Sequence, residues 1–324
     1  MSETEIILRI NAMGDILLTV PTLRAIAARG IDLHLVIHGR WAQLGEFLPA
    51  NVHYYNGTGS LIRLAGQLKK LHARAVFDLQ GKLSTVALRS MLNAPITRVY
   101  QKRNFSEQLL ALRGKYPLRF SDQRPVWQKY AEVCGVSLDS PDASLNLNDD
   151  YLDACRKILH ELDLPEKKFI LLHPDASKPG KQIPEALLSA LQSGLPQLTA
   201  IIGTSTAALP AGIKALDLRN RFSLYHLPGI IHLASAVVSS DSGPMHLTRA
   251  VGTPLAALFF QTCPSLGFAP IPADNVIVLS EPMPCKPCSL HGQNFECPEG
   301  HFACRNIDIP GTVDKIARFF ADFL

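Results

Sequence analysis

A seven-residue segment, 240–246, combines the residue types that bind an anion at the start of a helix. It follows an apolar run at 236–239 that predicts a strand, and its candidate ligand residues are Asp241, Ser242, Gly243 and His246. Small polar residues favour the position before a helix, a glycine lets a ligand approach the main chain, and Pro244 fits the first helical turn. The N–H groups of that helix end, together with the helix dipole, favour a diphosphate. The alternative is ordinary helix capping, with His246 as a surface histidine.

A second polar turn, Gly14-Asp15, follows the first apolar run of the chain at 5–10. The glycine permits a tight turn, and Asp15 places a carboxylate at the carboxyl end of a predicted strand. Group transfer to a hydroxyl needs a base that takes the proton, and a carboxylate can serve as that base. The alternative is that Asp15 only caps the helix that follows.

Four of the seven cysteines lie close together near the end of the chain, and they are Cys285, Cys288, Cys297 and Cys304. The first two of them form a C-x-x-C motif. Four thiolates around one ion are typical of a structural zinc or iron site. His291 and His301 are alternative ligands. An all-cysteine site leaves no open position, so the metal would be structural. Reduced thiols or a redox pair are the alternatives, because the spacing is tighter than in most zinc knuckles.

The elements that must position these residues alternate between strand and helix in both halves of the chain. Strands are predicted at 5–10, 31–38, 52–55, 76–80, 96–100, 169–173, 198–203, 236–239, 254–260 and 275–280. Helices are predicted at 19–29, 151–162, 184–192, from 244 onward and at 313–324. This alternation predicts an α/β fold, with two Rossmann-like parallel-sheet domains that face each other across a cleft. Ligands of such sheets bind at the carboxyl ends of the strands.

The length of 324 residues favours two domains, since single cores rarely grow beyond ~250–300 residues. We expect a first domain at 1–150, which ends in a linker at 137–150 rich in Ser, Asp and Asn. The second domain is expected at 151–308 and includes the cysteine-rich loop 285–304. A C-terminal helix at 309–324 follows, with packing on the first domain as one option.

The composition excludes a disordered or membrane-spanning chain. Hydrophobic residues make up 47% and charged residues 19%, and no apolar run is long enough to span a bilayer. The acidic start lacks the pattern of a signal peptide, so we expect a cytoplasmic protein with reduced cysteines.

Positive charge is concentrated in the first half of the chain. Residues 1–150 carry 18 Lys and Arg against 13 Asp and Glu, within a net charge of +4. Nine basic residues lie in one stretch: Lys82, Arg89, Arg98, Lys102, Arg103, Arg113, Lys115, Arg119 and Arg124. They favour an anionic partner, with a solvated surface as the alternative. We do not expect nucleic acid as the partner, because no recognition motif accompanies the charge.

The segment 240–254, Ser-Asp-Ser-Gly-Pro-Met-His-Leu-Thr-Arg-Ala-Val-Gly-Thr-Pro, resembles the signature of glycosyltransferase family 9, the ADP-heptose-dependent heptosyltransferases. The Gly-Asp pair at 14–15 and Phe-Asp-Leu-Gln-Gly at 77–81 are also similar to the family, and the resemblance covers nearly the whole chain. It implies a GT-B fold and inverting transfer of heptose from ADP-heptose to an acidic lipopolysaccharide core acceptor. In the family the turn that corresponds to 241–246 binds the donor diphosphate, which implies the same role here. The resemblance also implies that Asp15 is the base and that no catalytic metal is needed. Comparable cysteines occur in the family, and some relatives are thought to bind iron through them.

The segment that follows the strand at 169–173 keeps part of another family pattern, at Ala176, Ser177, Lys181 and Pro184. The resemblance implies that Lys181 neutralises the leaving diphosphate, with Lys178 as the rival. Asp175 departs from the pattern, because the family has a glycine there. Residues 204–207, Thr-Ser-Thr-Ala, also lack the acidic residue with which the family often meets the nucleotide ribose. The base of the donor nucleotide therefore stays open.

Three functions follow from these observations. The first is a cytoplasmic heptosyltransferase, with peripheral binding at the inner membrane as an option, whose partners are a nucleotide-sugar donor and an acidic glycolipid acceptor. The second is a related family 9 transferase that uses another nucleotide-sugar donor or a protein acceptor. The third is a non-catalytic scaffold that binds a nucleotide sugar.

Overall fold

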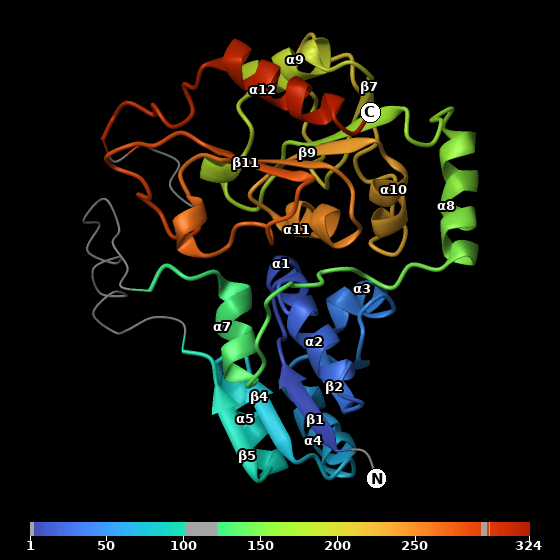
Figure 1. Ribbon diagram of the computed structural model, residues 1–324, viewed down its shortest axis with the longest axis vertical. Helices are drawn as coiled ribbons and strands as arrows, with labels where there is room; N and C mark the ends of the chain where they lie inside the picture. The colour runs from blue at the N-terminus through green and yellow to red at the C-terminus, as the bar shows by residue number, and fades with distance from the viewer. Residues whose placement is uncertain (1–2, 102–121, 293–296, 298) are drawn as a thin grey trace. The chain divides into compact units, whose positions relative to one another are not determined.

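The computed structural model describes residues 3–101, 122–292, 297 and 299–324. Within these residues the chain forms two compact units, one made of 3–101 and 124–146 and the other of 122–123 and the described part of 147–324. Each unit contains one fully parallel sheet with helices packed on it (Figure 1). The α/β class with two Rossmann-like domains is therefore confirmed.

The first unit contains a five-stranded sheet in the order β3-β2-β1-β4-β5. Its strands are β1 (Thr4–Leu8), β2 (Asp32–His38), β3 (Asn51–Tyr55), β4 (Ala75–Asp78) and β5 (Ile96–Val99). Its helices are α1 (Met13–Leu17), α2 (Val20–Ala27), α3 (Ala42–Gly45), α4 (Leu61–Lys69), α5 (Leu83–Leu92) and α7 (Val126–Val133). A separate short helix, α1, precedes the helix expected at 19–29, because Pro21 lies in the first turn of α2 and cannot continue a longer helix.

One layer of the core of the first unit lies between the sheet and the pair α4 and α5. Strand side chains pack there against Leu64 and Leu68 of α4 and Leu88 of α5, and they include Ile6, Leu8, Val36 and Val76. Strands β1 and β4 are buried along almost their whole length, as are most residues of β2. That burial is the reason why they read as continuous apolar runs in the sequence.

The second unit contains a six-stranded sheet in the order β11-β10-β9-β6-β7-β8. Its strands are β6 (Phe169–His173), β7 (Leu198–Ile201), β8 (Leu216–Asp217), β9 (Ala236–Ser240), β10 (Leu255–Phe259) and β11 (Val276–Ser280). Its helices are α8 (Asp149–Glu161), α9 (Glu185–Gly194), α10 (Leu227–Leu233), α11 (Gly243–Ala250) and α12 (Ile309–Ala321). Counted from β6, the strand order is 3-2-1-4-5-6, so the chain reverses its direction of growth between β6 and β9. Ligands of such sheets bind in the crevice beyond the carboxyl ends of those two strands.

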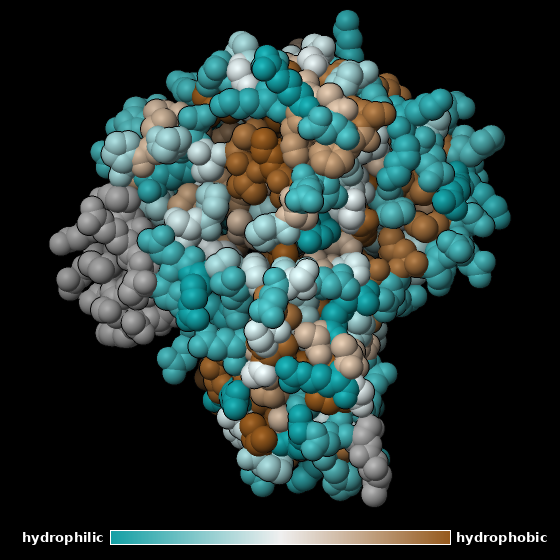
Figure 2. All heavy atoms as spheres, in the orientation of Figure 1, coloured by the Kyte–Doolittle hydropathy of each residue, from teal (hydrophilic) through white to brown (hydrophobic). Residues whose placement is uncertain are grey.

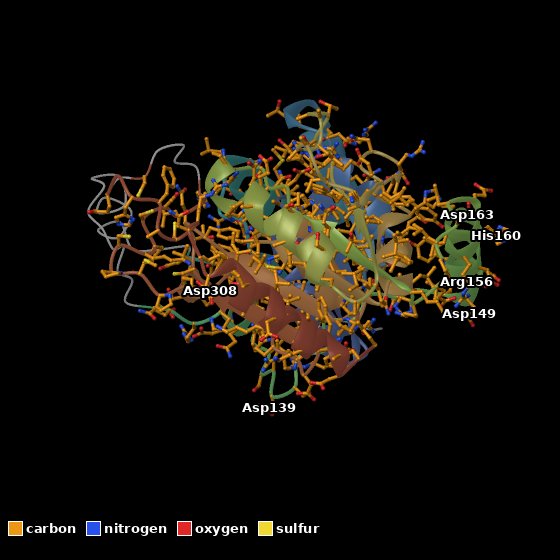
Figure 3. All side chains as sticks on the ribbon, turned by 90° about the horizontal axis from the view of Figure 1, so that it is seen from above. Asp139, Asp149, Arg156, His160, Asp163 and Asp308 are labelled. Carbon is orange, nitrogen blue, oxygen red and sulfur yellow. The ribbon has the colours of Figure 1, made fainter. Side chains whose placement is uncertain are left out.

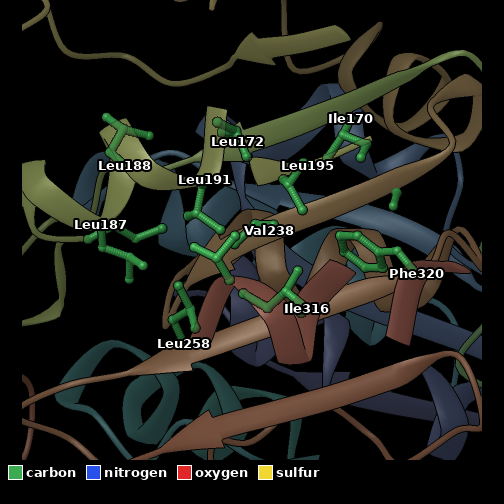
Figure 4. Packing of buried hydrophobic residues seen from close by; sticks show 14 of the residues in the cluster. Ile170, Leu172, Leu187, Leu188, Leu191, Leu195, Val238, Leu258, Ile316 and Phe320 are labelled. Carbon is green, nitrogen blue, oxygen red and sulfur yellow. The ribbon is translucent and has the colours of Figure 1, made fainter. Parts of the chain in front are cut away.

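One layer of the core of the second unit lies under α9 and α12, which cover one face of its sheet, while α10 and α11 lie on the other (Figure 1). Figure 4 labels Leu187, Leu188 and Leu191 of α9, Leu195 just after it, and Ile316 and Phe320 of α12. They pack against side chains of the sheet, of which Ile170, Leu172, Val238 and Leu258 are labelled. The apolar face of the C-terminal helix is thus part of this core. Each fully buried leucine contributes ~1.5–3 kcal/mol to folding.

Helix α8 has an ordinary solvated outer face. Asn148 caps it by accepting the N–H of Tyr151 at 2.8 Å. Its outer face is mostly hydrophilic (Figure 2), and Arg156 and His160 lie along it (Figure 3). The Arg156 guanidinium pairs with Glu166 at 2.9 Å. No helix in the described part of the chain has the length and apolar character that crossing a membrane requires.

Only part of the predicted basic stretch can be placed. Lys102, Arg103, Arg113, Lys115 and Arg119 lie outside the described residues. Of the remainder, Lys82, Arg98 and Arg124 are exposed, and Arg124 pairs with Glu132 at 2.9 Å. The anionic partner of this stretch stays a prediction.

Candidate functional site

The Asp15 carboxylate lies in α1, just beyond the carboxyl end of β1, and its side chain is 20% exposed. Its Oδ2 atom lies 2.5 Å from the Arg9 guanidinium and accepts the N–H of Ala12 at 3.2 Å. The hydroxyl of Tyr130 donates to Oδ1 at 3.2 Å. Asp15 therefore does cap its helix, as the alternative interpretation expected. It is also held in one orientation by two side chains from other elements.

Arg9 is a buried cation at the end of an apolar strand, with only 3% of its surface exposed. It donates to the carbonyl of Leu79 and lies over the ring of Tyr130, 5.3 Å from the centroid. Burial lowers the pKa of Arg9, but Tyr130 and Asp15 more than offset this effect, so it stays charged. Burial, and then the charge of Asp15, raise the pKa of Tyr130 well above its usual value. Tyr130 therefore stays protonated and can act as a hydrogen-bond donor to Asp15.

A second polar loop, after β4, is joined to the loop that contains Asp15. The buried Asp78 carboxylate accepts the N–H groups of Gln80 at 3.0 Å and Gly81 at 2.8 Å. The Gln80 side chain in turn accepts the N–H of Asn11 at 3.0 Å. The strand order places the reversal of this sheet between β1 and β4. The two loops that bear polar residues there thus form one connected edge.

In the second unit, the amino end of α11 lies beyond the carboxyl end of β9. Ser242 precedes the helix in an extended conformation, and its side chain does not cap it. The Ser242 hydroxyl instead donates to the carbonyl of Ser240 at 3.1 Å and lies 3.2 Å from Nδ1 of His173. Gly243 is the first residue of α11, and the N–H groups of a helix's first turn have no partner within the helix, so an anion is favoured there.

Lys181 and Asp241 form an ion pair beside this helix end, with Nζ 2.8 Å from Oδ2. Thr262, beyond β10, donates its hydroxyl to the same carboxylate oxygen at 2.8 Å. The side chains of Lys181 and Asp241 are only 18% and 6% exposed, whereas Lys178 is exposed. A partly buried pair of this kind mainly fixes position, because desolvation offsets most of the attraction. The structure therefore brings Lys181, and not Lys178, together with the 240–243 turn.

His246 lies in α11 and is buried, with 7% of its surface exposed. The interpretation of His246 as an ordinary surface histidine is therefore wrong. The reason is the apolar face of α11, which packs on the sheet through Met245 and Leu247 and carries the neighbouring histidine inward.

His173 is a buried histidine at the end of β6, and burial lowers its pKa to about 4. The neutral imidazole is favoured in the folded state, whereas the unfolded chain takes up a proton near pH 6.5. The contribution of the His173 side chain to the free energy of unfolding is therefore fully present above pH 6.5, and it is lost as the pH falls toward 4. At pH 4.5 the loss is about 2–3 kcal/mol.

Replacing His173 by glutamine should remove that part of the pH dependence. The free energy of opening can be measured from hydrogen exchange of the β6 and β9 amides at pH 7 and pH 4.5. We expect the difference between the two pH values to be about 2–3 kcal/mol smaller in the variant than in the wild type. If the free energy of opening changes equally between the two pH values in both proteins, the pKa of His173 is not lowered in the folded state.

The cysteine-rich segment is anchored to the same edge of the second sheet. The half-buried Lys286 donates to the carbonyl of Phe259 and to the hydroxyl of Ser280, both at 2.9 Å. The N–H of Gly180 donates to the carbonyl of Gly292 at 2.8 Å, so the segment also supports the turn that carries Lys181. A Cβ atom added to Gly292 would lie 2.5 Å from Cγ of Lys181. The segment thus helps to set the position of Lys181.

A metal site is not assembled among the residues that the structure describes, because no three His, Cys, Asp or Glu side chains in them form a group that could hold an ion. The thiols nevertheless influence one another. Burial and then the charges of Cys304, Cys285 and Cys297 raise the pKa of Cys288 to about 11. Burial raises the pKa of Cys297, but N–H groups of residues 299–302 more than compensate and lower it. The structural metal therefore stays a prediction from the spacing, and no step of the chemistry depends on it.

Several residues of the site were not identified from the sequence. Arg9 and Tyr130 hold Asp15, while His173 and Thr262 hold the 240–242 turn. A single arginine within an apolar strand was a usable signal for Arg9, since a buried cation needs a partner. Tyr130 lies 115 positions from Asp15, and no local pattern pointed to that pairing.

Comparisons with known proteins agree with this geometry. The family model described as glycosyltransferase family 9 (heptosyltransferase) matches residues 61–298. Lipopolysaccharide heptosyltransferase 1 of Pseudomonas aeruginosa is 24% identical, over 87% of this chain and 85% of its own length. The glycosyl transferase family 9 structure from Veillonella parvula has a TM-score of 0.76 at 18% identity, covering 99% of this chain and 97% of that one. The E. coli ADP-heptose lps heptosyltransferase II has a TM-score of 0.73 at 16% identity, and the match covers 99% of both chains.

Proposed function

Because the chain belongs to glycosyltransferase family 9, the heptosyltransferases, and is a glycosyltransferase of the GT-B fold, we propose that it transfers heptose from ADP-heptose to an acidic acceptor of the lipopolysaccharide core. The transfer inverts the configuration at the anomeric carbon. The names of the Pseudomonas aeruginosa and E. coli relatives support this donor and this acceptor class.

One observation supports the donor site most strongly. The amino end of α11 opens at the point where the second sheet reverses, and the Lys181–Asp241 pair lies beside it. A helix amino end with a neighbouring ammonium group suits a diphosphate. The neutral His173 lies next to Ser242 and adds a polar side chain without a charge.

The proposed reaction is a single displacement. The acceptor oxygen attacks the anomeric carbon, the bond from that carbon to the phosphate oxygen breaks, and ADP leaves. Asp15 takes the proton of the attacking hydroxyl. Negative charge grows on the departing diphosphate, where the N–H of Gly243 and the Lys181 ammonium stabilise it. His246 would act as a further contact of the diphosphate turn.

The acceptor is proposed to bind to the first unit, whose sequence carries the excess of basic residues. A phosphorylated or Kdo-bearing lipid A core supplies the matching negative charge. Such an acceptor places the enzyme in the cytoplasm, at the inner surface of the membrane.

The test is a transfer assay with ADP-heptose and a Kdo-bearing lipid A acceptor, in which mass spectrometry follows the addition of one heptose. Product that forms without added metal supports the proposal. Nucleotide preference is measured separately by thermal shift with ADP, UDP and GDP. A protein that is stabilised by UDP or GDP and not by ADP would instead be a family 9 transferase with another donor. Binding of ADP-heptose without transfer to any acceptor would favour the scaffold.

The cysteine cluster yields a prediction of its own. We expect the purified protein to contain about one equivalent of zinc or iron, since four cysteine thiolates bind either ion tightly. Replacing Cys288 by serine should reduce the metal content severalfold, while Cys134→Ser, at a buried thiol in the first unit, should not change it. Elemental analysis of both variants and the wild type decides the matter. A wild-type protein that is free of both metals would leave the cluster as reduced thiols.

A further inference from the structure

The Asp175 carboxylate lies at the carboxyl edge of the second sheet, and neither the diphosphate turn nor the acid–base chemistry accounts for it. We propose that Asp175 accepts hydrogen bonds from the hydroxyls of the donor's ribose. This assignment rests on the proposed function, because it concerns the nucleotide of the same donor.

The sheet order indicates where a ribose would lie. In sheets ordered 3-2-1-4-5-6, a carboxylate at the end of the second strand usually binds the ribose hydroxyls of a nucleotide. The second strand here is β7, and the residues after it are Ile202, Gly203 and Thr204. The expected strand end therefore offers no carboxylate of its own.

Asp175 brings a carboxylate to that strand end from the neighbouring strand, β6. A Cβ atom added to Gly203 would lie only 2.4 Å from Oδ2 of Asp175, so the side chain occupies the space that this glycine leaves free. The N–H of Ser205 donates to the same oxygen at 3.4 Å. Because residue 203 has no side chain, the Asp175 carboxylate can occupy the place that an acidic residue at the end of β7 would take.

Toward the residues that the structure describes, most of the hydrogen-bonding capacity of this carboxylate is unused. In the described part of the chain, its one hydrogen-bond donor is the N–H of Ser205, at long range. The charge of the nearby Arg219 is attracted to Asp175, but its side chain makes its hydrogen bonds elsewhere, with two to Asp217 at 2.8 and 2.9 Å and one to the carbonyl of Ala207 at 2.8 Å. An ionised carboxylate has about four acceptor positions, and Asp175 is partly exposed. It can therefore receive two hydroxyls of a diol.

The main chain of Asp175 is also bonded to the diphosphate turn. The Ser240 hydroxyl donates to the carbonyl of Asp175 at 2.6 Å and lies 3.3 Å from the hydroxyl of Ser242. In a nucleoside diphosphate the ribose and the first phosphate are adjacent groups, so their binding residues must be adjacent too. A carboxylate repels phosphate, which assigns the ribose to Asp175 and the diphosphate to α11 and Lys181.

Calorimetry with ADP and 2′,3′-dideoxy-ADP tests the assignment. We expect wild-type protein to bind ADP about 10–100-fold more tightly than the dideoxy compound, because two hydrogen bonds to a charged acceptor are lost. In Asp175→Ala the two affinities should become equal within about twofold, through weaker binding of ADP. Asp175→Asn is the second variant and should reduce the ratio at least severalfold. Asp274→Asn, at an exposed carboxylate just before β11 in the same unit, is the matched control and should keep the wild-type ratio.

The outcomes separate the two proposals. If wild-type protein binds ADP but both Asp175 variants keep its preference for ribose, the assignment is overturned and the proposed function stands. A wild-type protein that binds ADP and dideoxy-ADP equally well also overturns it. A wild-type protein that binds no nucleoside diphosphate overturns both.

Discussion

Replacing Asp15 by asparagine should lower the turnover number for heptose transfer by about 10³-fold, because an amide cannot take the proton of the attacking hydroxyl. The dissociation constant for ADP should change by less than about twofold, since the diphosphate residues belong to the other unit. Turnover is measured by product mass spectrometry and ADP binding by calorimetry. Substantial transfer by the variant would remove Asp15 from the chemistry.

This variant needs a folding control, because it leaves the buried Arg9 without its carboxylate. A buried charge that loses its partner costs about 3–5 kcal/mol. The double variant Arg9→Met/Asp15→Asn removes both charges, and it should regain stability without regaining activity. Trp41 and Trp127 both belong to the first unit, so tryptophan fluorescence reports the folding of that unit directly.

The substitution Tyr130→Phe tests the hydrogen bond that orients Asp15 and keeps the carboxylate itself. It removes the hydroxyl that donates to Oδ1 of Asp15 at 3.2 Å and retains the ring under Arg9. We expect turnover to fall by roughly tenfold, in proportion to one hydrogen bond to a charged group, with ADP binding unchanged. A Tyr130→Phe enzyme with full activity would show that Arg9 and the Ala12 N–H suffice to orient the base.

Replacing Lys181 by glutamine should lower kcat/KM by about 10²–10³-fold, since the ammonium group opposes the charge that grows on the departing diphosphate. Lys178→Gln is the matched control, because this lysine is exposed and lies three positions away. Its kcat/KM should stay within about twofold of the wild-type value. Initial rates at several ADP-heptose concentrations provide both numbers.

The ion pair complicates the Lys181 variant, since Asp241 would be left as a buried and unpaired carboxylate apart from Thr262. The double variant Lys181→Gln/Asp241→Asn removes this charge. If it remains as slow as the single variant, the loss of the ammonium group is the cause. If it recovers activity, the repulsion between Asp241 and the diphosphate was the cause. A reversed result, with Lys178 essential and Lys181 dispensable, would contradict the assignment.

Much of the fold could be predicted from local patterns. Buried parallel strands such as β6 and β9 are continuous apolar runs, and this burial makes both recognisable from the sequence. The start of α11 was recognisable because Gly243 and Pro244 suit the first turn of a helix. The short β8 was not predicted, since its two residues, Leu216 and Asp217, are exposed and form a strand only by pairing with β7.

The amino-acid sequence by itself determined the alternation of strands and helices, the polar turns at Asp15 and Asp241, and the likeness to one family. These features depend on residues that are neighbours in the chain, where apolar periodicity and capping act. Only the tertiary structure decided that Lys181 pairs with Asp241, that Arg9 and Tyr130 hold Asp15, and that Asp175 covers Gly203. Those contacts join loops that become neighbours only when a sheet sets its strand order, and no local pattern encodes which strand ends will meet.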